Sequence, residues 1–207
     1  MNRRVVFYGD SNTYGYDPRG FLGMRYPAGI RWTEIVREHF GDEYEIAEEG
    51  QNGRLLPSLP REERLVEQIL AGCSEGDLLF IMLGTNDILL TAHPDAGKAI
   101  RKMEVLLDWL LKMRLGPDIV VIGPVPIAET GEDMHRYFKE SLRMNDGFEA
   151  ACAKRRIEYH NAGEWNIPLA FDGVHFSEEG CRRFADRVIG ILAGEGNDGQ
   201  KQDAVRA

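Results

Sequence analysis

The chain has 207 residues, 43% of them apolar and 29% charged, which is typical of a globular protein long enough for one full hydrophobic core. It carries 34 acidic against 25 basic side chains, and the net charge of −9 argues against nucleic acid or an anionic membrane as a partner. No apolar run approaches the ~20 residues that a membrane-spanning helix needs, and the expected location is cytoplasmic.

Five short apolar segments are predicted to be β-strands. Residues 77–84 and 118–124 are continuously apolar rather than alternating, as expected of strands that are buried on both faces of a parallel sheet. In chain order, the predicted strands are residues 3–9, 44–50, 77–84, 118–124 and 156–162.

Segments with helical periodicity separate these strands. In the longest pattern, apolar side chains recur at three- and four-residue spacing from Ala96 to Leu111, and Gly116 and Pro117 end it. The alternation of strands and helices predicts an α/β protein, a three-layer α/β/α sandwich that forms one domain over residues 1–193. The Gly-rich, polar residues 194–207 are expected to be a flexible tail. The predicted helices are residues 31–40, 61–72, 96–115, 133–155 and 177–193.

The cysteines do not indicate a metal site or a disulfide framework. Cys73, Cys152 and Cys181 are odd in number and show no C-x-x-C spacing. Reduced, buried thiols are the expected state of all three.

Chemically distinctive residues follow several of the predicted strands. Ser11 follows the first strand, Gly53 the second and Asn86 the third, whereas Asp172 and His175 precede the last helix. In parallel α/β sheets, ligands bind beyond the carboxyl ends of the strands. We therefore expect these five residues to meet at one edge of the sheet.

The five residue types are those that acyl transfer requires. A serine hydroxyl needs a base such as His175 to take its proton, and an aspartate fixes the tautomer of that base. Backbone N–H groups at Ser11 and Gly53, with the Asn86 amide, would stabilise an oxyanion, each donor contributing about 10²–10³ in rate. Glycine at position 53 would let the backbone approach the reacting centre closely.

Each residue also has a purely structural interpretation. Ser11 suits a helix cap, Asn52-Gly53 and Asp172-Gly173 suit turns, and Asn86-Asp87 could cap a helix. His175 is one of five histidines. The joint placement of these residues after successive strands favours the catalytic interpretation.

Four sequence blocks resemble those of the GDSL-type esterase/lipase family, also called the SGNH hydrolases. "GDSNTYG" (9–15) resembles the first block, "EEGQNGR" (48–54) the second, "GTND" (84–87) the third and "DGVH" (172–175) the last. They occur in the family's order, and the resemblance extends over roughly residues 3–193. Within the family, the segments "FYGDSNTYGYDP" (7–18) and "IMLGTND" (81–87) are most similar to those of the bacterial arylesterase and acyltransferase-like branch.

This resemblance implies a role for each of the five residues. Ser11 would be the nucleophile, His175 the general base and acid, and Asp172 its orienting carboxylate, with an oxyanion hole from Ser11, Gly53 and Asn86. It also implies a flavodoxin-like sandwich with a five-stranded parallel sheet and neither a metal nor an organic cofactor. The sequence departs from the family at Asn12, where leucine gives the family its common name, and this bears on the polarity of the pocket.

A substrate pocket is predicted from residues that flank the catalytic positions. The polar segment 127–137 follows the fourth strand and is expected to be either a mobile rim over the site or a surface loop without substrate contact. The predicted wall residues, each of which could instead serve packing alone, are Asn12, Tyr14, Tyr16, Arg54, Pro126, Ile127 and Val174.

The favoured function is a serine esterase that hydrolyses short-chain, acetyl-like esters through an acyl-enzyme and can transfer the acyl group to other alcohols. Carbohydrate O-deacetylase, lysophospholipase and thioesterase are alternatives within the same class. A flavodoxin-like protein whose residues 9–15 cradle a phosphate or flavin is the alternative from a different class. The expected partner is a small-molecule ester. The oligomeric state stays open, although relatives of this branch often form homo-oligomers.

Overall fold

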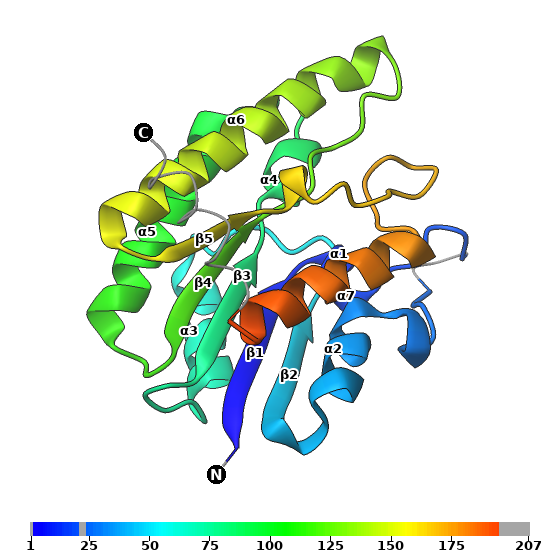
Figure 1. Cartoon of the computed structure of the whole chain (residues 1–207). Coiled ribbons are helices and arrows are strands. Elements are labelled where there is room, and N and C mark those ends of the chain that lie inside the picture. Colours follow the sequence, from blue (N-terminus) through cyan, green and yellow to red (C-terminus); the bar gives the residue numbers. More distant parts are fainter. Residues whose placement is uncertain (1, 21–23, 195–207) are drawn as a thin grey trace, which may run out of the picture.

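A five-stranded parallel sheet forms the centre of the molecule (Figure 1). The computed structural model describes residues 2–20 and 24–194, so most of the predicted tail, residues 195–207, lies outside the described residues. The strand order is β2-β1-β3-β4-β5, the flavodoxin-like order, and every neighbouring pair is parallel. The predicted fold class is confirmed. The strands are β1 (Arg3–Gly9), β2 (Tyr44–Gly50), β3 (Leu78–Met82), β4 (Asp118–Gly123) and β5 (Glu158–Asn161).

Helices cover both faces of this sheet. Helices α3, α5 and α6 pack on one face, whereas α2 and α7 pack on the other (Figure 1). The long helices begin and end within two residues of the predicted boundaries. They are α2 (Trp32–Phe40), α3 (Pro60–Leu70), α5 (Ala96–Met113), α6 (Glu132–Arg155) and α7 (Glu178–Leu192). Two short helices were not predicted, α1 (Ser11–Tyr14) and α4 (Thr85–Leu89), and 3₁₀ turns occur at Ala28–Ile30, Gly41–Glu43 and Ala162–Glu164.

The apolar run of β1 is continuous because both of its faces are buried. Val5 and Phe7 point to the face covered by α2 and α7, whereas Val6 and Tyr8 point to the opposite face. All four are at most 4% exposed. Because side chains alternate along a strand, a central strand needs apolar residues at every position.

The carboxyl ends of the central strands lie in one row. Gly9 of β1 pairs with Gly50 of β2 on one side and with Met82 of β3 on the other. Helix α1 sits directly on this row, because a Cβ atom on Gly50 would lie 2.2 Å from the backbone nitrogen of Tyr14. The two glycines therefore let the turn that carries Ser11 approach the sheet closely.

No helix within residues 2–20 and 24–194 has both the length and the apolar character needed to cross a membrane. The three cysteines are unpaired, and Cys152 and Cys181 are buried. Burial raises the pKa of both of these thiols to about 12, which keeps them protonated and unreactive near neutral pH.

Candidate active site

Ser11 is the first residue of α1, directly beyond the end of β1. The Asp10 side chain caps the helix, since its Oδ1 accepts the Asn12 N–H at 3.0 Å. Gly15 ends the helix in the left-handed region, with φ of 82°. The four-residue helix is therefore a fixed platform, and it leaves Ser11 only 7% exposed.

Asp172 and His175 lie in a tight hairpin that precedes α7. Leu169 and Phe176 form an antiparallel bridge, and the Ala170 N–H donates to the His175 carbonyl at 2.7 Å. Within the hairpin, Asp172 Oδ2 accepts the Nδ1–H of His175 at 2.6 Å. Its Oδ1 accepts the backbone N–H groups of Val174 and His175, each at 3.0 Å.

These hydrogen bonds keep Asp172 ionised. Desolvation by burial raises the pKa of Asp172, but the hydrogen bonds from His175 and from the two backbone amides outweigh it and hold the pKa below its ordinary value. A charged carboxylate at this position favours Nδ1–H on His175 and stabilises an imidazolium. The other ring nitrogen, Nε2, is then free to accept a proton.

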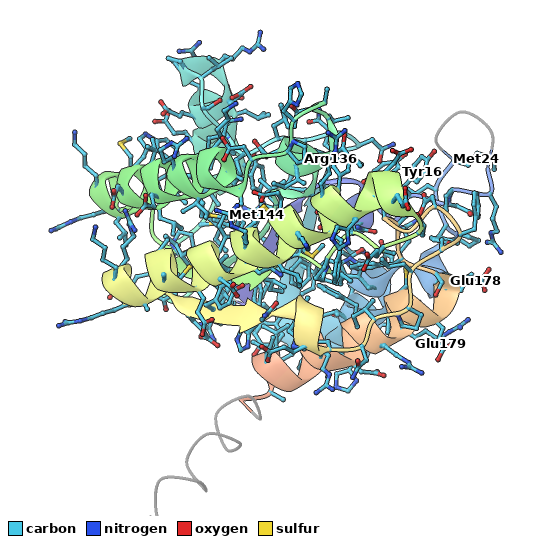
Figure 2. All side chains as sticks on the ribbon, turned by 90° about the horizontal axis from the view of Figure 1, so that it is seen from above. Tyr16, Met24, Arg136, Met144, Glu178 and Glu179 are labelled. Carbon is cyan, nitrogen blue, oxygen red and sulfur yellow. The ribbon has the colours of Figure 1, made fainter. Side chains whose placement is uncertain are left out.

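The structure brings Ser11 and His175 together across 164 residues of sequence. His175 Nε2 lies 3.0 Å from Ser11 Oγ, within the range of a hydroxyl-to-imidazole hydrogen bond. The Tyr16 ring packs against the imidazole, with 4.4 Å between ring centroids. Figure 2 shows Tyr16 on the same side of the molecule as Glu178 and Glu179, which begin α7 just after the hairpin. The arrangement Ser11–His175–Asp172 can activate a hydroxyl for attack on a carbonyl.

The predicted oxyanion donors lie on three segments that directly follow β1, β2 and β3: Ser11 on α1, Gly53 on a loop and Asn86 on α4. Among the described residues, no backbone acceptor pairs with the N–H of Ser11 or of Gly53. Asn86 is 8% exposed, and its Nδ2 donates one hydrogen to the Arg54 carbonyl at 3.1 Å. Because an amide nitrogen carries two hydrogens, the second is available for a ligand.

The structure changes the reason for a glycine at position 53. A Cβ atom there would meet nothing within 4 Å, so space does not require glycine. The residue adopts φ of 71°, in the left-handed region that glycine enters at low cost. The Gly53 turn is thus set by backbone conformation rather than by close approach.

Asp87, for which the sequence predicts only a capping role, holds the loop after β2 in place, and Lys102 pairs with it. Asp87 Oδ2 accepts the Leu56 N–H at 2.9 Å, and its Oδ1 pairs with Lys102 Nζ at 2.7 Å. The Asp87 side chain is 3% exposed. Asp87 belongs to the "GTND" block and directly follows Asn86 on α4, so the sequence indicates that it lies at the site. Its partner Leu56, on the loop after β2, is shown only by the fold.

Several predicted pocket residues are occupied by contacts within the protein. Arg54 donates to the Gly9 carbonyl at 2.9 Å and stacks over the Tyr8 ring, so it joins the ends of β1 and β2. Ile127 is 1% exposed, so it packs in the core rather than forming an open wall. The Arg25 guanidinium lies over the Tyr14 ring, with 4.5 Å between Arg25 Cζ and the ring centroid.

Of the remaining predicted wall residues, Tyr16, Val174 and Asn12 contact or adjoin His175, whereas Pro126 lies near the end of β5. Tyr16 contacts the imidazole ring, and Val174 directly precedes it in the hairpin. Pro126 is partly buried beside Gly163, which follows β5. The Asn12 side chain bonds to the backbone on both sides of His175. It therefore contacts the hairpin rather than an open pocket.

The segment 127–137 borders the hairpin that carries Asp172. The Ala128 N–H donates to the Gly173 carbonyl at 2.8 Å, and α6 begins at Glu132 within the segment. Residues 129–133 are exposed. The segment is therefore adjacent to the candidate site, and its mobility stays a prediction.

A cavity of about 550 Å³ adjoins the Gly53 turn. Leu55 and Leu65 line it together with Arg61 and Arg64. A larger cavity of about 780 Å³ lies at the opposite, amino-terminal end of the strands, beside Arg3. Of these two cavities, the smaller is lined by a candidate site residue, Gly53. Across residues 2–20 and 24–194, no three side chains of the types that bind metals come together in a cluster that could hold an ion.

The buried carboxyl of Asp10 leads to a prediction about pH and stability. Desolvation raises the pKa of Asp10 from 3.8 to about 6, although the Asn12 N–H and the His175 charge act in the opposite direction. Between pH 4 and pH 6, Asp10 is protonated in the folded protein but largely ionised in the unfolded chain. The contribution of Asp10 to the unfolding free energy therefore increases as the pH falls from 7 to 4. Relative to an Asp10→Asn variant, the wild type should gain about 2 kcal/mol of unfolding free energy over this range.

Denaturant unfolding of both proteins at several pH values measures this difference. The variant is a matched comparison, because its side-chain oxygen can still accept the Asn12 N–H. Two stability curves that run parallel between pH 7 and pH 4 would contradict the assignment of a raised pKa to Asp10.

Comparisons with known proteins indicate the family and the fold of the chain. Residues 7–183 match the model of the GDSL-like Lipase/Acylhydrolase family. Among solved structures, Est24, a carbohydrate acetylesterase from Sinorhizobium meliloti, is 26% identical, with a TM-score of 0.80 over 93% of this chain and 99% of its own. An aryl esterase from M. smegmatis is 24% identical, with a TM-score of 0.79 over 93% and 99%. A lipolytic protein of the G-D-S-L family from Veillonella parvula DSM 2008 is 20% identical, with a TM-score of 0.72 over 92% and 98%. No curated protein sequence matches the chain.

Proposed function

The chain belongs to the GDSL-like lipase/acylhydrolase family, and from this premise we propose that it hydrolyses short-chain acyl esters through a triad of Ser11, His175 and Asp172. The hydrogen-bonded series from Ser11 Oγ through His175 to Asp172, with distances of 3.0 and 2.6 Å, is the observation that carries the proposal. We also assign residues 1–193 to one catalytic domain, since all five strands pair in a single sheet.

In the proposed reaction, Ser11 Oγ attacks the ester carbonyl carbon while His175 Nε2 takes the hydroxyl proton. The tetrahedral adduct then breaks the bond to the alkoxy oxygen, and the alcohol leaves with the proton from His175. The acyl group remains on Oγ. Water then attacks this acyl-enzyme with the same imidazole as base, and the carboxylic acid is released. Another alcohol in place of water would give acyl transfer.

The negative oxygen of the adduct is assigned to three donors. The N–H groups of Ser11 and Gly53 and the second Nδ2 hydrogen of Asn86 come from three separate segments, namely α1, the loop after β2, and α4. Helix α4 is joined to the loop after β2, because Asn86 donates to the Arg54 carbonyl and the Leu56 N–H donates to Asp87. Arg54 in turn donates to the Gly9 carbonyl at the end of β1. Donors that are fixed before the reaction stabilise the developing charge without reorganisation.

A short acyl group suits the packing around Ser11. Asn12 and Thr13 are at most 8% exposed, and Ile127 is part of the core. The cavity beside Gly53 combines arginines with leucines, whereas a site for a long acyl chain would need a continuous apolar lining. We therefore favour acetyl-like esters over lipids.

Carbohydrate O-deacetylation is the second candidate. It is favoured by the similarity to Est24, whose described activity is that of a carbohydrate acetylesterase. The polar part of the cavity lining, including Gln51 and Gln68, offers hydrogen-bonding groups that a sugar leaving group could use.

Active-site labelling tests the nucleophile and the enzyme class together. An organofluorophosphate should modify one serine per chain, and peptide mapping should place the modification on Ser11. The reagent reacts with a serine that a neighbouring base activates, so a binding protein of flavodoxin type would remain unlabelled. The absence of stoichiometric modification at Ser11 would overturn the proposed function.

A panel of substrates then separates the two candidates. We expect kcat/KM on aryl esters to decrease as the acyl chain lengthens from acetyl to octanoyl, because Ser11, Asn12 and Thr13 are buried and the cavity beside Gly53 has no continuous apolar lining. If the natural leaving group is a sugar, acetylated sugars should be hydrolysed with higher kcat/KM than phenyl acetate. A preference for octanoyl esters would contradict the short-chain assignment.

A further inference from the structure

Asn12 bonds to the backbone on both sides of His175. Its Nδ2 donates to the Val174 carbonyl at 3.2 Å, and its Oδ1 accepts the Phe176 N–H at 2.9 Å. We propose that Asn12 is a positioning residue that holds the His175 imidazole within reach of Ser11. This inference rests on the proposed function, because it concerns the same Ser11–His175 pair.

The two bonds resemble the pairing of a β-strand. In an extended segment, the carbonyl of residue i−1 and the N–H of residue i+1 point to the same side and flank residue i. The Asn12 amide supplies the complementary donor and acceptor for a segment centred on His175. On the opposite edge, the Ala170 N–H pairs with the His175 carbonyl at 2.7 Å. The backbone at His175 is therefore held from both sides.

The site requires an amide rather than another side chain of similar size. A carbonyl needs a donor and an N–H needs an acceptor, and only asparagine offers both on a side chain of this length. Aspartate would place an oxygen against the Val174 carbonyl. Leucine would leave both backbone groups without a partner, and an unsatisfied buried group costs about 1–3 kcal/mol.

Asn12 is itself firmly anchored. It is 8% exposed, and its backbone N–H donates to Asp10 Oδ1 at 3.0 Å. Its backbone carbonyl accepts the Nε1–H of Trp32 at 2.9 Å, and Trp32 is 2% exposed in the core beneath α2 and α7. A displacement of the Asn12 amide would therefore need a displacement of α1 or of the core.

The anchoring of Asn12 matters for catalysis because Asn12 directly follows Ser11. Ser11 and Asn12 are consecutive residues of α1, so the same turn presents the hydroxyl and fixes the backbone of the base. Other contacts also hold the hairpin, including the bond from Tyr26 Oη to the Phe176 carbonyl at 3.2 Å and that from Ala128 to Gly173. Loss of the Asn12 amide should thus shift His175 without unfolding the hairpin.

Asn12→Leu tests the role by removing both bonds, and Asn12→Asp tests it without changing side-chain size. Asn145 provides the matched control, because it is 3% exposed and its Nδ2 donates to the Pro124 carbonyl at 2.8 Å and to Asn161 Oδ1 at 3.0 Å. Asn145→Leu and Asn145→Asp therefore remove a buried amide that does not touch the hairpin. For all five proteins, kcat and KM on an aryl acetate, the rate of organofluorophosphate labelling and the thermal midpoint are measured.

The expected result is a lower kcat and a lower labelling rate in both Asn12 variants, each by about 10–100-fold, with KM within about twofold of wild type. The Asn145 variants should lose thermal stability to a similar degree but keep kcat within about threefold. For Asn12→Asp, the ratio of its kcat/KM to that of wild type should increase at low pH, because a protonated carboxyl regains a donor for the Val174 carbonyl. Asp10, Asp172 and His175 also face this region, and the ratio to wild type corrects for their own titration.

Asn12 variants whose kcat falls no further than that of the Asn145 variants would overturn the positioning role. Nitrogen-15 NMR of the His175 imidazole tests the positioning role independently of the proposed function, because the measurement requires no turnover. In wild type, the His175 Nδ1 should carry the proton in a hydrogen bond, and this signature should weaken in Asn12→Leu but not in Asn145→Leu. If wild-type protein is neither active nor labelled, the proposed function fails; if it is both and the Asn12 variants match their controls, only the positioning role fails.

Discussion

Replacement of Ser11 by alanine should lower kcat on an aryl acetate by at least about 10³-fold while the protein remains folded. Within the part of the chain that the structure describes, the side-chain partner of the hydroxyl is His175 Nε2 at 3.0 Å. Its removal therefore eliminates the nucleophile and disturbs little else. The α1 helix is capped by Asp10 and Gly15, neither of which depends on Oγ. Initial rates and a circular dichroism spectrum of the variant measure the two parts of the prediction.

Ser141 is the matched control for this replacement. It is 3% exposed, and its hydroxyl accepts the Ile127 N–H at 3.2 Å and donates to the Phe138 carbonyl at 2.7 Å. Ser141→Ala should lose about 1 kcal/mol of stability from these bonds and retain most of its kcat. Retention of more than a tenth of wild-type kcat in Ser11→Ala would remove Ser11 from the role of nucleophile.

The sheet could be predicted from the sequence because burial on two faces imposes a strong local pattern. Residues 78–82 and 119–123 are uninterrupted apolar runs, and glycine marks the ends of β1, β2 and β4. The stripe along α5 is equally local, since Ala96, Ala99 and Met103 occupy one face that packs on the sheet. The strand–helix alternation then left few arrangements for a parallel sheet.

The short helices at the site have no comparable signal. Four residues in α1 and five in α4 are too few for a helical period to be visible. What stabilises α1 is tertiary, because Trp32 bonds to the Asn12 carbonyl and Gly50 leaves room for Tyr14. The residues of the site could therefore be predicted from the sequence, whereas the short helices that carry Ser11 and Asn86 could not.

Side-chain roles at the pocket were the least predictable part. The sequence predicts Asn12 and Arg54 on the pocket wall, because both are polar and adjacent to expected catalytic residues. Their hydrogen-bonding partners are Val174, Phe176 and Gly9, which lie 162, 164 and 45 residues away in the chain. Polarity alone does not distinguish a group that faces substrate from one that satisfies a distant backbone group.

Asp172→Asn should cause the other large loss of activity, about 10³–10⁴-fold in kcat. The carboxylate accepts three hydrogen bonds, one from His175 Nδ1 and two from the backbone N–H groups of Val174 and His175. An amide has only one oxygen. If that oxygen keeps the two backbone donors, the NH₂ group faces Nδ1 and donates to it, so the imidazole proton moves to Nε2. The nitrogen next to Ser11 can then no longer accept a proton.

The opposite amide orientation is no better, because its NH₂ group would face the two backbone N–H groups and leave both unpaired. Asp77→Asn is the control, since Asp77 is 8% exposed and also accepts two backbone N–H groups, from Arg4 at 2.7 Å and Ser74 at 2.6 Å, at the far end of the sheet. That variant should be less stable yet active. Equal losses of kcat in the two variants would mean that Asp172 acts only on stability. If only Asp172→Asn loses kcat, and its thermal midpoint is near that of Asp77→Asn, the loss of activity comes from the changed tautomer of His175 and not from unfolding of the hairpin.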